Sequence, residues 1–303
     1  TKLVVAMVFA ALVPVLIVAL LATGVILSSL EAGLREDADR QLTVGLNLVL
    51  RSVGRLGDEC VQLSESSDIA AALMPPVEAE GVAKLVIEIF GSSIEVDPQR
   101  RATMRTAIET WLSREAAHVP SARLQVLDAT GEIVFDQTLG GADARFKDVG
   151  VKHGDPVIAA GQSWTRGVSL VTIGDLIVMR AVSPIVDPSL TLRGVLVLST
   201  PFDGDFADGI KGALSADVLL GGPSGTLSAT FRSNLGRRGN PLVLGAEARQ
   251  LAIAGQRAFR DFDLPTGTYK VAATALFDNA DKPVGLIGVA LDREPLAATK
   301  TLA

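Results

Sequence analysis

The sequence has little of the chemistry that catalytic and metal sites need. Its 303 residues include one cysteine, Cys60, and two histidines, His118 and His153. A single cysteine excludes an internal disulfide framework and a structural zinc site built on cysteines, and neither histidine lies in a motif with metal-ligand spacing. Phosphate-binding loops, HExxH motifs and GxSxG motifs are also missing from the sequence. We therefore predict a protein that is not an enzyme and that needs no cofactor or metal.

Basic residues are few relative to acidic ones. The chain has 28 Lys and Arg against 34 Asp and Glu, a formal net charge of −6. Affinity for nucleic acid comes from clustered Lys and Arg, so we expect no nucleic-acid partner. Hydrophobic residues make up 48% of the chain, which excludes general disorder. The length suits roughly two domains of ~150 residues each.

The longest uncharged stretch lies at the start of the chain, from Leu3 to Leu30. A helix rises ~1.5 Å per residue, so about 20 residues cross the ~30 Å hydrocarbon core of a membrane. A secretory signal peptide has a shorter apolar region of ~7–15 residues and ends in small cleavage-site residues. We therefore predict an uncleaved transmembrane helix over residues 1–30, with residues 3–30 in contact with lipid.

The charges beside this stretch predict its orientation. Lys2 precedes it and an acidic run, Glu31 to Asp39, follows it. Cytoplasmic flanks favour Lys and Arg, so residues 31–303 are expected outside the cytoplasm, on the far side of the membrane. No later stretch is apolar for long enough to cross back. The chain starts at Thr1, which suggests a partial chain, and residues 297–303 are interpreted as the lead-in to a missing second transmembrane helix.

Helical spacing continues past the apolar stretch, and we predict a stalk helix over residues 31–75, ended by Pro75 and Pro76. Along residues 42–67, side chains that are nearly all apolar alternate by four and three positions; they are Leu42, Leu46, Val49, Val53, Leu56, Cys60, Leu63 and Ser67. This heptad seam can pack on the chain's own domains, or it can pair with the same helix of a second chain in a homodimer. The spacing fits both. Cys60 lies on the seam, which favours a small core residue over a reactive thiol.

Residues 76–120 are expected to form a helical segment packed on the next module. Asp97 followed by Pro98 is typical of a helix start. Apolar residues from Met104 to Trp111 then recur at helical spacing and predict one inward face. Pro120 is expected to end this helix.

The rest of the chain contains an internal repeat. Residues 124–135 and 218–229 both read as a strand, a turn and a strand, at an offset of 94 positions. Residues 178–203 and 271–296 share a second strand–loop–strand pattern at an offset of 91, with Gly194 or Gly285 leading the last strand. Matching patterns in matching order predict one α+β module used twice, with an antiparallel sheet in each copy. We assign the copies to residues 121–203 and 204–296.

Several segments resemble the double-Cache sensor regions of bacterial transmembrane receptors, which contain two PAS-like modules in tandem. The matching segments are VLDATGEIVFD at 126–136, DPVIAAGQSWTRG at 155–167, LIVMRAVSPIVDPSLTLRGVLVLST at 176–200 and VLLGGPSGTLSAT at 218–230. The resemblance implies an extracytoplasmic region of a histidine kinase, chemoreceptor or cyclase, with residues 31–303 on the periplasmic side of a cell inner membrane. It also implies a membrane-distal module at 121–203 and a membrane-proximal module at 204–296. The family's amino-acid-binding branch uses a Tyr/Arg/Trp/Asp signature. This chain has a single tyrosine, Tyr269, in the proximal module, so an α-amino acid ligand is not implied.

Five residues of the distal module are candidate ligand contacts: Arg180, Trp164, Arg166, Arg145 and Asp136. Arg180 lies in an apolar strand, where a charge needs a partner. Either it pairs with an internal acid such as Asp136 or it binds an anionic ligand. Trp164 and Arg166 share strand parity and can form one wall of a pocket, although Trp164 can equally cap the module core.

Two functions are compatible with this pattern. In the first, the chain is a sensing region that binds a small solute in the distal module and transmits the signal through the long helix. In the second, it is a membrane-anchored interaction or dimerisation module without a pocket. A void lined by Trp164 and Arg180 favours the first function, and a packed sheet with Arg180 already paired favours the second.

Overall fold

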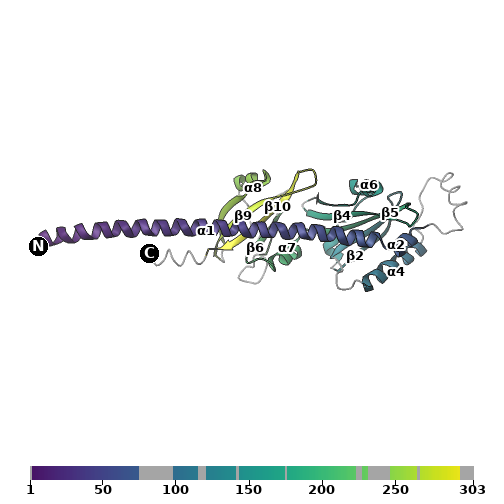
Figure 1. Ribbon diagram of the computed structural model, residues 1–303, viewed down its shortest axis with the longest axis horizontal. Coiled ribbons are helices and arrows are strands. Elements are labelled where there is room, and N and C mark those ends of the chain that lie inside the picture. The colour runs from purple at the N-terminus through teal and green to yellow at the C-terminus, as the bar shows by residue number, and fades with distance from the viewer. Residues whose placement is uncertain are drawn as a thin grey trace.

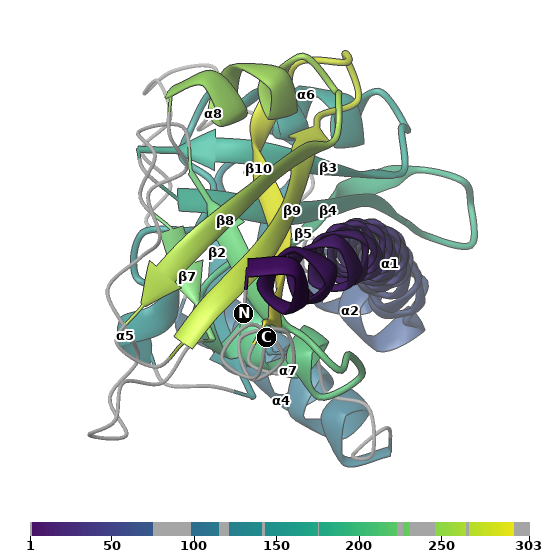
Figure 2. The same ribbon diagram turned by 90° about the vertical axis from the view of Figure 1, so that its left-hand side faces the viewer.

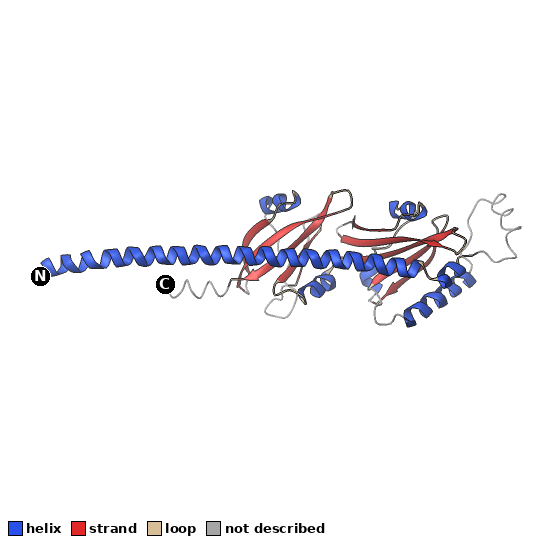
Figure 3. Ribbon diagram, in the orientation of Figure 1, coloured by secondary structure: helices blue, strands red, loops and turns tan. Residues whose placement is uncertain are grey.

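One long helix carries two sheets in a row (Figure 1). The computed structural model describes residues 2–74, 98–114, 121–140, 143–174, 176–222, 227–230, 246–264 and 267–293. Helix α1 spans Lys2–Ser64 and runs alongside both sheets (Figure 3). Its apolar first part extends beyond the proximal sheet and is long enough to cross a membrane, and none of its 18-residue apolar window is buried within the protein. The anchor and the two modules therefore share a single continuous helix.

The two sheets have the same strand order, β2-β1-β5-β4-β3 and β7-β6-β10-β9-β8, and every pair is antiparallel. This confirms the predicted α+β fold with two tandem PAS-like modules. The distal strands are β1 (Ala122–Asp128), β2 (Ile133–Leu139), β3 (Gly167–Ile173), β4 (Leu176–Val186) and β5 (Leu192–Pro201). The proximal strands are β6 (Asp217–Gly221), β7 (Leu227–Ala229), β8 (Ala258–Leu264), β9 (Gly267–Phe277) and β10 (Pro283–Asp292).

Short helices cover the sheets on the sides that strand alternation makes apolar. These helices are α2 (Ser67–Ala72), α4 (Pro98–Arg114), α5 (Asp143–Phe146), α6 (Pro156–Gln162), α7 (Gly204–Lys211) and α8 (Ala246–Ile253). Met104 and Ile108 of α4 are buried, as their spacing predicts. Helix α4 spans Pro98–Arg114, and its predicted start signal at Asp97 and predicted stop at Pro120 lie outside the described residues. The first part of the predicted 76–120 helical segment, residues 76–97, lies outside the described residues.

The heptad seam of α1 packs on the chain's own sheets. Leu42, Val49, Leu56, Cys60 and Leu63 are all buried in the main core, together with strand residues of both modules. The Cys60 thiol donates to the Leu196 carbonyl oxygen at 3.6 Å. The view along α1 shows the helix lying against the strands (Figure 2). The predicted packing of the seam on the chain's own sheets is the arrangement in this structure, and the homodimer through the 42–67 seam stays a prediction. The seam also ends earlier than predicted, since α1 stops at Ser64 and Ser67 is exposed in α2.

Ion pairs fasten α1 to the proximal module at the end of its apolar stretch. Arg293, which follows β10, pairs with Glu31 of α1 at 3.0 Å and with Asp261 of β8 at 2.6 Å. One turn further on, the guanidinium of Arg35 lies 4.4 Å from the centre of the Phe259 ring. The proximal sheet therefore holds α1 where the helix leaves its apolar part.

The two modules touch through the ends of two hairpins. The Asn279 amide in the β9–β10 turn donates to the Val168 carbonyl oxygen of β3 at 3.0 Å. The Thr172 hydroxyl donates to the Val284 carbonyl oxygen at 3.4 Å. A change in the angle between the modules must therefore alter this contact and the packing on α1 together.

Candidate functional site

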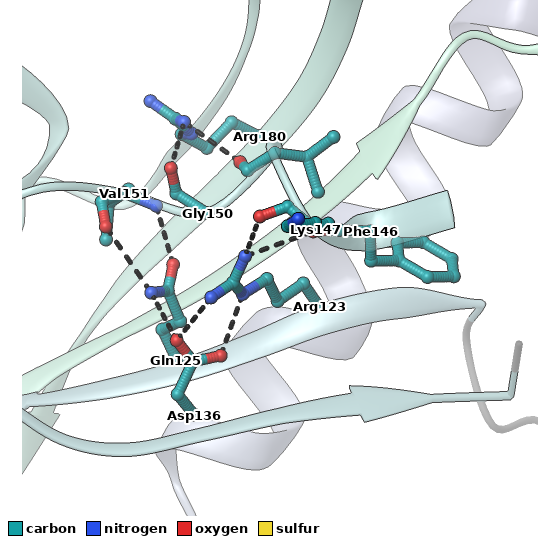
Figure 4. A network of polar contacts seen from close by, with 9 residues as sticks. Arg123, Gln125, Asp136, Phe146, Lys147, Gly150, Val151 and Arg180 are labelled. Carbon is teal, nitrogen blue, oxygen red and sulfur yellow. Dashed lines mark hydrogen bonds and ion pairs between the residues drawn. The ribbon is translucent and has the colours of Figure 1, made fainter. Parts of the chain in front are cut away.

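Charged and polar groups line up on the face of the distal sheet that points away from α1. Strand register places Arg123 of β1 opposite Ser199 of β5, and Ser199 opposite Arg180 of β4. Apolar side chains of the same strands, including Leu124 and Leu198, face α1 instead. Side chains alternate between the two faces of a strand, so the three polar residues share the outer face. The segment between β2 and β3 covers this face (Figure 4).

Arg180 is 3% exposed and its charge is paired within the chain. One Nη donates to an Asp155 carboxylate oxygen at 2.6 Å, and the other donates to the carbonyl oxygens of Val149 and Gly150 at 3.1 and 3.3 Å. Burial lowers the pKa of Arg180, although the charge of Asp155 and its hydrogen bond oppose this shift. Of the two expectations for Arg180, pairing with an internal acid describes this structure, but the acid is Asp155 and not Asp136.

Asp136 instead pairs with Arg123 of the neighbouring strand. Both carboxylate oxygens of Asp136 accept from the Arg123 guanidinium, at 2.8 and 2.7 Å, and the side-chain amide of Gln125 donates to the same carboxylate at 3.0 Å. This is the bidentate geometry that suits Arg and carboxylate. The hydrogen bond that Arg123 donates to Asp136 is the main cause that raises the pKa of Arg123, against the opposing effect of burial.

These polar groups hold residues 146–151, which we call the strap, against the sheet. Arg123 donates to the carbonyl oxygens of Phe146 and Lys147 at 3.1 and 2.6 Å. Gln125 accepts from the Val151 backbone N–H at 2.6 Å. With the second Gln125 contact, from its amide to the Val151 carbonyl oxygen at 3.4 Å, and the two Arg180 contacts, six hydrogen bonds join three side chains to the backbone of the strap. The strap thus occupies the place where the sequence suggested a pocket.

Two buried polar atoms beneath the strap have no hydrogen-bond partner. They are the Ser199 hydroxyl oxygen and the Arg180 Nε, and their residues lie opposite one another in the β4–β5 ladder. Unpaired buried polar groups cost free energy and call for an explanation. Phe146, Val149 and Val178 fill the adjoining space as a small apolar cluster. An open hollow of about 500 Å³, lined in part by Arg123, Asp136 and Lys147, adjoins the strap.

Asp155 connects the strap to helix α6. One of its carboxylate oxygens accepts from the Val157 backbone N–H and caps α6, and the other binds Arg180. Asp155, Gln125 and Arg123 were not predicted as site residues. Asp155 before Pro156 is a helix-start signal, and Gln125 interrupts an apolar strand, so both carried a signal in the sequence.

Trp164 and Arg166 do not join this network. Trp164 is 50% exposed, with a φ of 64°, at the turn that ends α6. The Trp164 backbone N–H donates to the Gly161 carbonyl oxygen. Trp164 therefore takes the position just after the helix end, where glycine is common. Arg166 is exposed and pairs with Glu65, at the end of α1, at 2.9 Å. In this structure Trp164 and Arg166 form no common wall with Arg180, because both lie in the turn before β3 begins at Gly167, and their role in ligand binding stays a prediction.

Arg145 belongs to a different place, the junction between the modules. Its guanidinium binds both carboxylate oxygens of Asp203, which caps α7, and donates to the Ser121 hydroxyl at 3.1 Å. Burial opposes the charge of Arg145, but the hydrogen bond and charge of Asp203 outweigh it and raise the pKa. His153 is exposed, and its closest acid is Glu132 at 3.9 Å. Within the described ranges, no group of three His, Cys, Asp or Glu residues is placed to hold a metal ion.

Comparison with known proteins identifies the fold. No protein-family model and no curated protein matches the sequence. The periplasmic domain of Vibrio cholerae LuxQ is similar over 84% of this chain and 100% of that domain, with a TM-score of 0.52 and 11% identity. The chain has the fold of a tandem PAS-like extracytoplasmic sensor region. The extracellular domain of vpHK1S-Z8, described as a histidine kinase, is similar over 89% of this chain and 97% of its own, with a TM-score of 0.51 and 12% identity.

A third structure has a lower similarity. The ligand-binding domain of the Campylobacter jejuni chemoreceptor Tlp3, in complex with L-norvaline, is 14% identical and has a TM-score of 0.46, over 88% of this chain and 93% of that domain. At 11% and 12% identity, the LuxQ and vpHK1S-Z8 domains show the fold of this chain and say nothing of its ligand.

Proposed function

We propose that this chain is the sensing region of a membrane signalling receptor, anchored by the first part of α1, with both modules outside the cytoplasm. The observation that carries the proposal is the continuity of α1. One helix runs from the apolar stretch past the proximal sheet to the distal sheet, and it buries Leu42, Leu56 and Leu63 in one core. A change in the distal module therefore reaches the membrane segment without crossing a flexible joint.

The strap is the proposed input element. A small anionic solute that enters from the hollow beside Arg123 would compete with Asp155 and with the strap carbonyls for the Arg180 guanidinium. The unpaired Arg180 Nε and Ser199 hydroxyl, both buried beneath the strap, offer it two further donors. Release of the strap would repack β4 and β5, and the far side of these strands holds Cys60 and Leu63 of α1. Such a solute shifts α1 only if it binds one arrangement of the strap more tightly than the other.

Three observations favour a second function, a membrane-anchored interaction module without a pocket. Arg180 is already paired, the strap fills the sheet face, and Trp164 is exposed in a strained backbone conformation. Exposed Trp residues are common energetic centres of protein interfaces. In this function a protein partner would provide the input at the surface around Trp164.

Thermal unfolding of the full chain in lipid nanodiscs, with a panel of small carboxylates, phosphates and neutral solutes, separates the two functions. Solute sensing predicts that an anionic solute raises the unfolding midpoint of the wild type, and that the shift is lost in Arg180→Met but kept in Arg166→Met. Arg166 is a matched control because it is an exposed arginine of the same module. If no solute in the panel shifts the midpoint, solute sensing is contradicted and the interaction module is supported.

The proposed location has its own test. Ser189 lies in the tight turn between β4 and β5, so Ser189→Cys adds an accessible thiol to a chain whose native Cys60 is buried. A membrane-impermeant maleimide should label this variant in intact cells of a Gram-negative host after outer-membrane permeabilisation. Labelling only after lysis would place the modules on the cytoplasmic side and contradict the proposal.

A further inference from the structure

A second concave site lies at the junction of α1, the distal module and α7. This cavity has a volume of about 520 Å³, within the range of small-molecule sites. Its floor is apolar and includes Leu56 of α1, Met179 of β4 and Phe206 of α7. The strap and Arg180 do not line it, so it is separate from the network described above.

Three arginines converge on this cavity. Arg51 and Arg55 reach it from α1, and Arg145 reaches it from the distal module. Arg51 and Arg55 are one turn apart on the same helix, and like charges at this spacing destabilise a helix. The side chain of Arg51 forms no hydrogen bond or ion pair with any residue that the structure describes, and Arg55 pairs with Glu59, at 3.7 Å between Nε and Oε1. Glu59 thus offsets the charge of Arg55 but not that of Arg51, and such a local conflict is typical of functional sites.

The remaining charges show where a ligand would find an excess of positive charge. Asp203 binds Arg145 through both of its oxygens, so that arginine is already neutralised. Asp205, the acid that lines the α7 side, is itself 3.5 Å from Arg145. Along α1, by contrast, Arg51 and Arg55 face a single acid, Glu59, within the cavity. The surplus of positive charge thus lies on α1, directly above an apolar floor.

From this arrangement we infer that the junction cavity binds a small organic carboxylate with an apolar body. The carboxylate lies against Arg51 and Arg55, whose planar guanidinium groups suit bidentate recognition, and the apolar body lies on Met179 and Phe206. The occupied site joins α1 to α7 and to the base of the distal module, the three elements that meet there. The binding itself does not depend on the proposed signalling function.

Titration calorimetry on the full chain in nanodiscs tests the inference with benzoate and adipate as probes and with benzamide and adipamide as their neutral counterparts. We expect the carboxylates to bind and the amides not to bind. The variant R51Q/R55Q should weaken binding about tenfold or more, because it removes both charge-assisted contacts. It should still fold, since both side chains are solvent-accessible rim residues of α1 and their mutual repulsion is removed.

Arg40→Gln is the matched control, because Arg40 is also an exposed arginine of α1 but lies outside the cavity. Unchanged binding in Arg40→Gln together with the loss in R51Q/R55Q supports the site. Three results overturn it: neither carboxylate binds the wild type, the amides bind as well as the acids, or R51Q/R55Q and Arg40→Gln bind equally. Carboxylate binding that survives R51Q/R55Q but is lost in Arg180→Met would move the anion to the strap and likewise overturn the junction site.

Discussion

Arg180 shows how a single buried charge organises the distal module. Its guanidinium has one acid, Asp155, and two backbone carbonyl oxygens as partners. Removing the acid leaves a buried cation without a counter-charge, whereas removing the arginine leaves a carboxylate that is 22% exposed and can hydrate. Loss of Asp155 therefore costs more free energy of unfolding than loss of Arg180.

We expect Asp155→Asn to destabilise the chain by about 3–5 kcal/mol and Arg180→Met by roughly 1–3 kcal/mol. Asparagine can still cap α6, so the first variant isolates the charge. The free energy of unfolding from urea titration at pH 7 measures both variants and the double variant, which should lose less than the sum of the two. An equal loss in both single variants would show that the pair is not controlled by burial of the arginine.

Asp187 is the residue with the clearest dependence on pH. Hydrogen bonds from Ser189 and from the Thr191 backbone, together with the Arg193 ion pair, lower the pKa of Asp187 to about 2. A carboxylate whose folded pKa lies below its unfolded value stabilises the fold at higher pH, and this stabilisation is lost as the pH falls from about 4 to about 2.

The matched variant is Asp187→Asn, which keeps the shape of the side chain and removes its titration. We expect the urea midpoints of wild type and variant to differ most above pH 4 and to converge towards pH 2. A difference that stays constant from pH 5 to pH 2 would contradict the role of the Asp187 charge in the β4–β5 turn.

At the scale of the elements, each module contains a close contact between neighbouring strands that only glycine permits. A Cβ on Gly194 of β5 would lie 2.2 Å from the Leu127 carbonyl oxygen, and a Cβ on Gly285 of β10 would lie 2.5 Å from the Gly221 carbonyl oxygen. These two glycines occupy equivalent places in the repeat. Both contacts are with backbone, which cannot move aside as a side chain can.

We therefore expect Gly194→Ala and Gly285→Ala each to destabilise the chain by roughly 1–3 kcal/mol, as overpacking does. Gly54→Ala is the control, since a Cβ there meets nothing within 4 Å and alanine favours a helix by about 1 kcal/mol over glycine. The midpoint of thermal unfolding should fall in the first two variants and rise slightly in the third. A neutral Gly285→Ala would show that the proximal copy tolerates a looser β6–β10 contact.

The elements themselves were predictable because they depend on local spacing. The repeat offsets of 94 and 91 positions anticipated both sheets, and the seam from Leu42 to Leu63 anticipated the buried face of α1. The partner of that seam was not predictable, since a sheet and a second helix demand the same apolar stripe. Heptad spacing predicts only which side chains are buried, and not what they pack against.

The site was less predictable because its partners come from separate elements. Asp155 lies at the N-terminal cap of α6, whereas Arg180 lies in β4. Strand parity could not predict which acid, Asp155 or Asp136, pairs with Arg180. Trp164 and Arg166 share parity, but alternation applies only within a strand, and β3 begins after them at Gly167. A positive φ at a tryptophan left no trace in the sequence.

For the whole molecule, Cys60 reports whether α1 stays on the distal sheet. Its thiol is fully buried between α1 and β5, and burial raises its pKa, opposed by a backbone hydrogen bond. We expect no reaction with a maleimide in the native state at pH 8, and labelling at the rate at which α1 detaches.

Urea-dependent labelling measures that detachment, and Leu63→Ala should speed it by removing a neighbouring seam contact. Leu50→Ala is the control, because Leu50 is a large apolar side chain of the same helix that is 58% exposed. Equal acceleration by both variants would show that labelling follows helix fraying and not release from the sheet.

The continuity of α1 also fixes the rotational angle of its apolar part about the helix axis relative to the two modules. The seam fixes which side of the helix faces the sheets, and an unbroken helix carries that azimuth into its apolar part. One residue inserted after Leu34 would turn the apolar part by about 100° relative to both sheets, while seven would return it to within about 20° of its starting angle. If the chain signals as proposed, insertions of increasing length should therefore change the signalling output with the period of the helix, although each module keeps its own fold.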